Sequence, residues 1–296
     1  MLKPRRTLKV YKWFILLFLT AFATACLVPI LAILSVSFSD ERSLALTGYA
    51  LLPAIPSLEA YRYLLASPAA IFRSYGVSVG VTAIGGFLSL CVITGIAYPL
   101  ARADFFLRRP LAFFVFFTML FNGGLVPWYI IISRSLHLQN TIWALILPYI
   151  ANAWYILLMR TYFQKVPIEL IESAKLDGAG EWRTLFSIVL PVVTPALATV
   201  ALFMTLTYWN DWWLAMLFVE EEALVPLQYR LYRIMSNIQF LTTQMTSGAV
   251  TVDLTKLPSE SARMAMCVIA AGPMLFVFPF FQKYFVRGLT VGAIKG

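Results

Sequence analysis

The sequence has few of the residues that catalytic and metal-binding chemistry uses. Its 296 residues include one histidine and three cysteines, and no G-x-x-x-x-G-K-[ST] phosphate-binding loop occurs in it. Cys26, Cys91 and Cys267 fall inside apolar runs, where a thiol behaves as a small hydrophobe, so we expect free thiols and no disulfide framework. The single histidine and the scattered cysteines offer no metal-ligand spacing. If nucleotide energy drives this protein, a partner must bind the nucleotide.

Charged residues are also scarce. They make up 12% of the chain against 60% hydrophobic residues, and the mean hydropathy is +0.80. A soluble protein has about 25% charged and about 45–50% apolar residues, so the composition predicts an integral membrane protein. The net charge of +9 does not indicate nucleic-acid binding, because the basic residues lie at the edges of apolar runs and do not cluster on a soluble face.

Six apolar runs are long enough to cross a hydrocarbon core about 30 Å thick, which takes about 20 residues of helix. They are residues 13–38, 75–100, 110–132, 141–159, 194–218 and 262–285. The first contains "ATAC", which loosely resembles a cleavage site or a lipid-attachment cysteine, but it continues apolar, so we expect an uncleaved anchor. The sequence predicts an all-α membrane protein with six transmembrane helices, organised as an N-terminal anchor with the first external loop, 1–74, and a core, 75–296.

Basic residues predict the orientation. With the N-terminus inside, the inner segments hold 15 of the 23 Lys and Arg residues, so the positive-inside rule places both termini in the cytoplasm. Two outer segments are too long to be simple turns. Residues 39–74 mix apolar, aromatic and charged residues, as an interfacial helix does. Residues 219–261 are more polar and form either a solvated connector or a docking face for an external partner.

A charged stretch, "VPIELIESAKLDGAGEWRTLFSIVLP" (166–191), interrupts the apolar pattern on the cytoplasmic side between the fourth and fifth runs. Pro167 suits a first helical turn, Glu169 and Glu172 offset the helix dipole, and Asp177-Gly178 ends the run. The pattern predicts a helix of about ten residues, or roughly 15 Å. It is too short and too polar to cross the membrane.

This short helix needs a surface to pack against, because isolated helices below about 12–15 residues are marginal in water. Ile168, Ile171 and Ala174 form an apolar strip, and Lys175 is close enough to Glu172 to pair with it. The helix is either a connector lying on the protein's own helix ends or a docking element for a partner. Pro191 and Pro195 at the start of the fifth run predict a corner there.

The same stretch resembles the signature loop of permease subunits of ATP-binding-cassette importers. The matching positions are Glu172, Ala174, Asp177, Gly178, Ala179, Phe186, Ile188, Leu190 and Pro191, and Ser173 stands where the pattern usually has Ala. Three further stretches, "FNGGLVPWYIIISRSLHLQNTIWALILPYI", "YWNDWW" and "PFFQKYFVRGLTVGAIKG", resemble the carbohydrate-uptake, maltose-importer-like branch and, within it, permeases for larger oligosaccharides. The resemblance covers about residues 61–296.

The resemblance implies a permease subunit that moves a sugar or oligosaccharide, neutral or acidic, across the bacterial cytoplasmic membrane. It also implies that this chain is not an enzyme and holds no cofactor, since partner ATPase subunits bind ATP and Mg²⁺. The expected partners are a second permease, two ATPase subunits and an external solute-binding protein. The cytoplasmic tail, with Gly292, Lys295 and Gly296, either reaches the ATPase interface or is a frayed terminus.

Polar residues inside the apolar runs are candidates for the translocation path, because such residues are costly in a membrane and usually point inward. The polar candidates are Asn122, Asn152, Asn210 and Asp211. Trp209 is a further candidate that offers an aromatic face, and Trp128, Trp154 and Trp212 lie nearby in the sequence. The alternative is that the tryptophans belong to an interfacial belt and the asparagines join helix to helix.

Two other functions compete with an ATP-driven importer. An ion-coupled secondary transporter should show internal repeats and buried acids at the midplane, and Asp211 is the acid that lies well inside a run. An intramembrane enzyme needs a nucleophile with a base, or metal ligands, within the spans. One histidine, placed in an outer loop, makes that reading poor.

Overall fold

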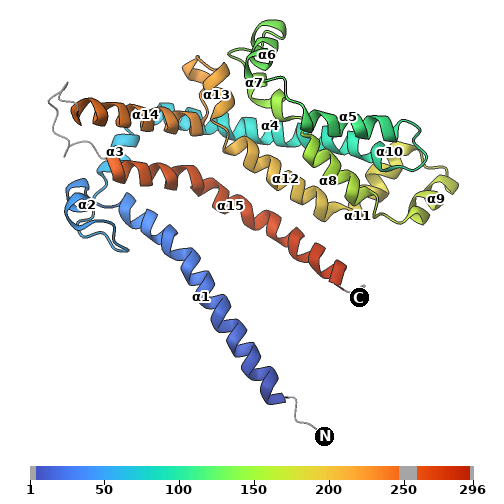
Figure 1. Cartoon of the computed structure of the whole chain (residues 1–296), viewed down its shortest axis with the longest axis horizontal. Coiled ribbons are helices and arrows are strands. Elements are labelled where there is room, and N and C mark those ends of the chain that lie inside the picture. Colours follow the sequence, from blue (N-terminus) through green and yellow to red (C-terminus); the bar gives the residue numbers. More distant parts are fainter. Residues whose placement is uncertain (1–4, 247–258, 294–296) are drawn as a thin grey trace. The chain divides into compact units, whose positions relative to one another are not determined.

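The computed structural model describes residues 5–246 and 259–293 (Figure 1). These residues form helices, which confirms the all-α prediction, and the strand-like pairing among them is one bridge between Ser39 and Pro56. The chain divides into two compact units. Unit 1 comprises Met1–Pro68 and Arg233–Gly272, and unit 2 comprises Ala69–Tyr232 and Pro273–Gly296.

The α-helices are α1 (Arg5–Ser37), α2 (Glu41–Thr47), α3 (Glu59–Leu64), α4 (Pro68–Ala101), α5 (Arg108–Leu120), α6 (Leu125–Ile130), α7 (Ile142–Ile146), α8 (Ala153–Phe163), α9 (Ile168–Leu176), α10 (Glu181–Thr184), α11 (Leu190–Val192), α12 (Thr194–Trp209), α13 (Trp213–Phe218), α14 (Leu227–Thr246) and α15 (Ser259–Ala293). Four shorter turns link them: η1 (Ile131–Ser135) and η3 (Leu185–Val189) are π-helical, and η2 (Leu147–Tyr149) and η4 (Glu222–Leu224) are 3₁₀-helical.

Three helices are long and apolar enough to cross a membrane by themselves, namely α1, α4 and α15. Three further helix pairs meet the same test together but are bent, by 112° between α5 and α6, by 49° between α7 and α8, and by 85° between the segment 181–192 and α12. The described residues therefore hold three straight spans, or six if each bent pair is one span.

The third apolar run is broken, whereas the sequence predicted one helix over 110–132. Gly124 has a φ of 87°, in the left-handed region that favours glycine, and the Asn122 side chain accepts a 2.8 Å hydrogen bond from its N–H. Adjacent Gly123 also disfavours a continuous helix, because glycine loses more backbone freedom on ordering than other residues do. Asn-Gly-Gly is a turn signal. The prediction missed the break because it counted only the length of the apolar run.

The fifth run is likewise shorter than predicted. The expected helix over 194–218 ends at Trp209, and a new helix, α13, begins at Trp213. Asp211 lies in the gap and accepts hydrogen bonds from the backbone N–H of Leu214, at 3.2 and 3.5 Å. A side chain that bonds the first turn of the following helix favours a helix start at this point, so the apolar run contains two helices.

Unit 2 has a continuous core contributed by α4, α7, α8, α12 and α13. Helices α4 and α12 approach each other closely at Gly85, where a Cβ atom would meet the ring of Tyr208 at 2.8 Å. The Tyr208 hydroxyl donates to the Ile146 carbonyl at 2.9 Å and shares a 2.8 Å hydrogen bond with Ser89. One tyrosine therefore fixes α12 to both α4 and α7.

The sequence predicted an interfacial helix in the segment 39–74. Its part in unit 1 forms two short helices, α2 and α3, and residues 69–74 belong to the start of α4 in unit 2. Glu41 of α2 receives four hydrogen bonds at the start of α15, from Ser259 Oγ, Glu260 N, Ser261 N and Ser261 Oγ, over 2.7–3.1 Å. Burial alone would raise the pKa of the Glu41 carboxyl, but these donors together lower it. A carboxylate at a helix N-terminus also complements the helix dipole.

Candidate functional site

A pocket of about 410 Å³ lies where the break between α5 and α6 meets α13 and the turn between α7 and α8. Aromatic side chains and one amide form much of its wall, which consists of Asn122, Gly124, Leu125, Trp128, Pro148, Tyr149, Trp213 and Leu214. Pockets that recognise small molecules combine such aromatic faces with a few polar groups. Because the helices are interrupted here, backbone polar groups at the helix ends also face this region.

Asp211 lies directly behind this wall. The Tyr149 hydroxyl donates to the Asp211 Oδ1 atom at 2.8 Å. The Asp211 carboxylate also accepts from the backbone N–H of Leu214, a second residue of the wall. The carboxylate thus connects two residues of the wall, one on each side. The candidate path residues Asn122 and Asp211 meet at this pocket, the first in its wall and the second as a support of it.

The other three candidate path residues lie elsewhere. Asn152 accepts from Trp154 N at 3.0 Å and begins α8, and the Asn210 amide donates to the Leu206 carbonyl of its own helix at 2.9 Å. Trp209 is buried, at 3% exposure, and packs near the ring of Tyr75. Asn152 and Asn210 therefore serve helix ends in this structure, and a role for these three in the path stays a prediction.

Sequence reasoning did not single out Tyr149 and Trp213 as site residues. Both lie in stretches rich in aromatic residues, "LPYI" and "YWNDWW". The available signal was the neighbouring Pro148 and Asp211, which mark helix interruptions. Helical periodicity could not assign the direction of either side chain, because each follows such a break.

The predicted cytoplasmic helix is present as α9 and ends as the sequence indicated. Gly178 has a φ of 75°, its N–H donates to the Lys175 carbonyl at 3.0 Å, and the Ala179 N–H donates to the Ala174 carbonyl at 2.9 Å. This pair of bonds is the Schellman motif, in which a glycine in the left-handed conformation closes the helix. The local backbone therefore favours glycine at position 178 before any partner is considered.

Two details of the predicted helix are wrong. Ile171 and Ala174 are buried, but Ile168 is 51% exposed, so the apolar strip facing this chain is shorter than expected. Lys175 does not pair with Glu172 in the described part of the chain; its Nζ lies 2.9 Å from Asp104 Oδ2 and 3.6 Å from Glu181 Oε1. Glu172, Ser173 and Asp177 are exposed on this helix and its cap.

The predicted corner is present after the loop. The segment 181–192 and α12 are bent by 85° around Val193, with Pro191 just before the bend and Pro195 in the first turn of α12. The Thr194 hydroxyl donates to the carbonyls of Leu190 and Pro191 at 3.1 and 2.9 Å. Phe186 is 60% exposed and stacks on Trp182.

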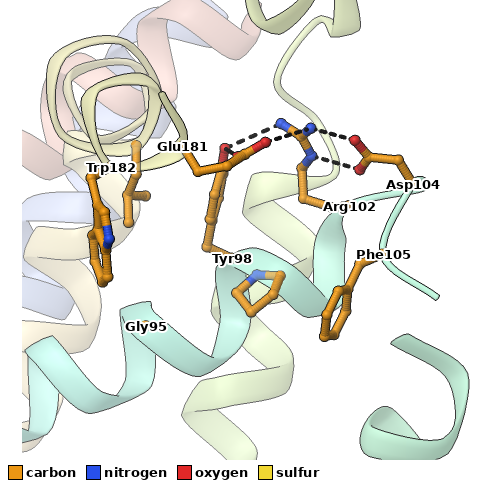
Figure 2. A pocket seen from close by; sticks show the side chains of 9 residues that line it. Gly95, Tyr98, Arg102, Asp104, Phe105, Glu181 and Trp182 are labelled. Atoms are coloured by element: carbon orange, nitrogen blue, oxygen red, sulfur yellow. Dashed lines mark hydrogen bonds and ion pairs between the residues drawn. The ribbon is translucent and has the colours of Figure 1, made fainter. Parts of the chain in front are cut away.

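A cluster of four alternating charges, Arg102, Asp104, Lys175 and Glu181, joins α9 and α10 to the end of α4, and sequence reasoning missed it. Figure 2 shows three of the four, Arg102, Asp104 and Glu181. Arg102 donates to both oxygens of Asp104, at 2.9 and 2.6 Å, and its NH2 lies 3.4 Å from Glu181. Tyr98 donates to Glu181 at 3.2 Å. With the two contacts of Lys175, the cluster forms a closed network.

The cluster is electrically balanced, with two cations and two carboxylates. Hydrogen bonds from Arg102 and then Lys175 hold the pKa of Asp104 well below its usual range, and the bond to Asp104 raises the pKa of both cations. Arg102 is buried, at 9% side-chain exposure, whereas its carboxylate partners are half exposed. In the sequence Arg102 counted only among the inside-facing positive charges, and Lys175 was expected to pair with Glu172. Spacing gave no sign that Asp104 and Glu181 converge on these two cations.

Of the predicted tail residues, Lys295 and Gly296 lie outside the described residues, and Gly292 lies in the last turn of α15.

Residues 76–291 match the model of the family described as binding-protein-dependent transport system inner membrane component. The chain belongs to this family: it is a multi-pass membrane subunit of an ATP-binding-cassette importer, and in this family a separate subunit hydrolyses ATP. Members work together with a further permease, an ATPase and a binding protein. These comparisons give no support to an ion-coupled secondary transporter.

Two relatives come from Bacillus subtilis (strain 168). The polygalacturonan/rhamnogalacturonan transport system permease protein YtcP is 39% identical, over 94% of this chain and 96% of that protein. Protein LplC is 36% identical, over 95% of this chain and 93% of that protein. Among solved structures, a chain of a bacterial ABC transporter involved in the import of the acidic polysaccharide alginate superposes with a TM-score of 0.77 at 28% identity, covering 96% of this chain and all of that one.

Proposed function

We propose that this chain is a permease subunit of a bacterial importer for acidic oligosaccharides, such as uronate-containing fragments of polysaccharides. Two of the similar proteins support an acidic substrate, because their names refer to polygalacturonan, rhamnogalacturonan and alginate. The observation that carries a sugar-contacting role for this chain is the pocket in which Asn122 meets the aromatic side chains of Trp128, Tyr149 and Trp213. Aromatic rings offer flat faces to sugar rings, and the amide offers hydrogen bonds to hydroxyls.

The described wall of this pocket contains no Lys or Arg. A buried carboxylate without a cationic partner is strongly unfavourable, so the substrate's carboxylates need basic groups from elsewhere. In this proposal the present chain binds ring faces and hydroxyls, and the second permease supplies the charges. This division of labour makes both permeases necessary for recognition.

In the same proposal the chain has six spans, both termini in the cytoplasm, and α9 as the coupling helix. The exposed Glu172, Ser173 and Asp177 contact the ATPase, and the small residues Gly178 and Ala179 allow close approach of its backbone. Phe186 and Pro191 continue the same surface toward the corner. Two ATPase subunits bind ATP and Mg²⁺ and draw the coupling helices of the two permeases together, and the spans behind them rotate. The tail residues Gly292, Lys295 and Gly296 extend toward the ATPases.

Uptake by the complete importer in proteoliposomes tests the substrate class. We expect uptake of oligogalacturonate and no comparable uptake of a maltodextrin of equal length. Trp213→Leu should raise the KM for uptake about two- to tenfold, the range expected for one lost aromatic contact. Trp143→Leu is the control, because Trp143 is 45% exposed on α7 and is not part of the wall. Preference for the neutral sugar would contradict the proposal.

A further inference from the structure

We propose that Arg102, Asp104, Lys175 and Glu181 form a positioning cluster that ties α9 to the cytoplasmic end of α4. The consequence is that a partner displacing α9 moves α4 directly, in addition to moving α12 through the chain. The inference rests on the proposed role of α9 as the coupling helix. It adds a second route of force, with named residues, from the loop to a membrane span.

The first step is that the cluster closes a loop. Lys175 is in the last turn of α9 and Glu181 is the first residue of α10, so residues 176–180, with the Schellman turn, connect them. Both side chains converge on the segment just after α4, Lys175 on Asp104 at 2.9 Å and Glu181 on Arg102 at 3.4 Å. The two ends of the turn are thereby joined to the same short segment, directly after the end of α4.

The second step is that the charged contacts add to the apolar packing of this region, in which Ile171 and Leu185 share one buried core with Leu100. Helix α9 has nine residues, of which Ile171 and Ala174 are buried. Beside the cluster, between α4 and α10, lies a cavity of about 420 Å³, flanked by Phe105 and Trp182 (Figure 2). Because side chains leave this junction partly open, the charged contacts strengthen the link between α10 and the end of α4.

The third step concerns why the link should persist while the transporter moves. Exposed ion pairs contribute little and exchange readily with water, but Arg102 is 9% exposed, and a buried charge that loses its partner is strongly destabilising. Its guanidinium also lies over the Tyr98 ring, 5.8 Å from the centroid, and donates to the Tyr98 hydroxyl. Arg102 is thus held by α4 itself, and the carboxylates of the loop must follow it.

Variants in the complete importer, reconstituted with its second permease, ATPase and binding protein, test the cluster. Lys175→Glu places a third carboxylate against Asp104 and Glu181. Asp104→Asn removes one charge from a residue outside the α9–α10 loop. For both we expect oligogalacturonate uptake per ATP hydrolysed to fall by roughly two- to thirtyfold, the range for mutations along a coupling path, while the ATPase stays bound.

Lys175→Arg should couple like the wild type, because it keeps the positive charge. Arg109→Glu, a charge reversal at an exposed residue of α5 on the same side, should leave coupling unchanged. Cysteines at positions 104 and 175, in a background without the native cysteines, remove two charges of the cluster and should lower coupling. A short bis-methanethiosulfonate linker between them should restore transport, because a covalent link replaces the ion pair.

Three outcomes would overturn the inference. The first is normal coupling in both charge variants. The second is uncoupling by Lys175→Glu with Asp104→Asn normal, which would mean that Lys175 contacts the ATPase itself. The third is that linking the two cysteines restores no transport. Gly178→Trp separates this failure from failure of the proposed function. If Gly178→Trp also couples normally, α9 is not the coupling helix; if it uncouples while the cluster variants do not, only the positioning cluster is wrong.

Discussion

The hydroxyl of Tyr149 donates a 2.8 Å hydrogen bond to the carboxylate of Asp211, and through it the turn after α7 is joined to the break between α12 and α13. Asp211 also accepts from the backbone of Leu214 in the first turn of α13. The acid that the sequence placed inside an apolar run is therefore engaged by two donors. An acid held in this way supports the pocket wall.

The first prediction separates the charge of Asp211 from its hydrogen bonds. Asp211→Ala removes the acceptor for both donors, the Tyr149 hydroxyl and the Leu214 N–H. We expect it to destabilise the protein by about 1–2 kcal/mol and to raise the substrate concentration that half-maximally stimulates ATP hydrolysis. Asp211→Asn keeps an acceptor for Tyr149 and Leu214 and should behave like the wild type. Thermal unfolding in detergent and ATPase titrations measure the two effects. An Asn variant as impaired as the Ala variant would assign the role to the charge itself.

The second prediction separates the two requirements at Gly178, conformation and room. Its φ of 75° costs a residue with a Cβ about 1–2 kcal/mol, while asparagine tolerates this region. Among the described residues, no atom beyond the two chain neighbours lies within 4 Å of a Cβ built there, so the added bulk is expected to meet a partner. We expect Gly178→Asn and Gly178→Trp both to abolish substrate-stimulated ATP hydrolysis and transport.

Membrane insertion, measured alongside, should be normal in both variants. Gly180→Ala is the matched control, since Gly180 has a φ of −70° and equally open surroundings. Normal coupling in Gly178→Asn would contradict the requirement for room and leave the conformation of the turn as the reason for the glycine.

Particular residues show how far the sequence could lead. The helix α9 and its end at Asp177-Gly178 were predictable, because capping and turn chemistry act over a few neighbouring residues. The breaks at Gly124 and Asp211 were not predicted, since apolar length was weighed above turn signals. The cluster of Arg102 with Glu181 could not be predicted at all, because it joins residues 79 positions apart, and no local rule specifies which charges meet.

The third prediction concerns the helix approach at Gly85. A methyl group there would lie 2.8 Å from the buried Tyr208 ring, so Gly85→Ala should cost about 1–3 kcal/mol through overpacking. Gly86→Ala is the neighbouring control, because its nearest atom would be at 4.0 Å. Thermal unfolding in detergent should show a lower Tm for Gly85→Ala alone. In a Tyr208→Leu background the Gly85→Ala change should cost less than in the wild type, because the ring that the methyl group meets is absent. Equal Tm values for the two alanine variants would contradict the close approach.

The fourth prediction concerns the pH dependence of the contact between α2 and α15 in unit 1. The pKa of Glu41 is lowered from its ordinary value of 4.5 in the folded protein, so the unfolded chain binds the proton more readily. The stability contributed by this carboxylate is therefore fully present above pH 4.5 and is lost as the pH falls through the lower folded value. Glu41→Gln, which keeps the shape but cannot be protonated, should lower the Tm at pH 7, because the charged acceptor for four donors is gone. The difference in Tm between the wild type and Glu41→Gln should shrink on acidification below pH 4.5, and a difference that stays constant through that range would mean that the charge of Glu41 does not stabilise the start of α15.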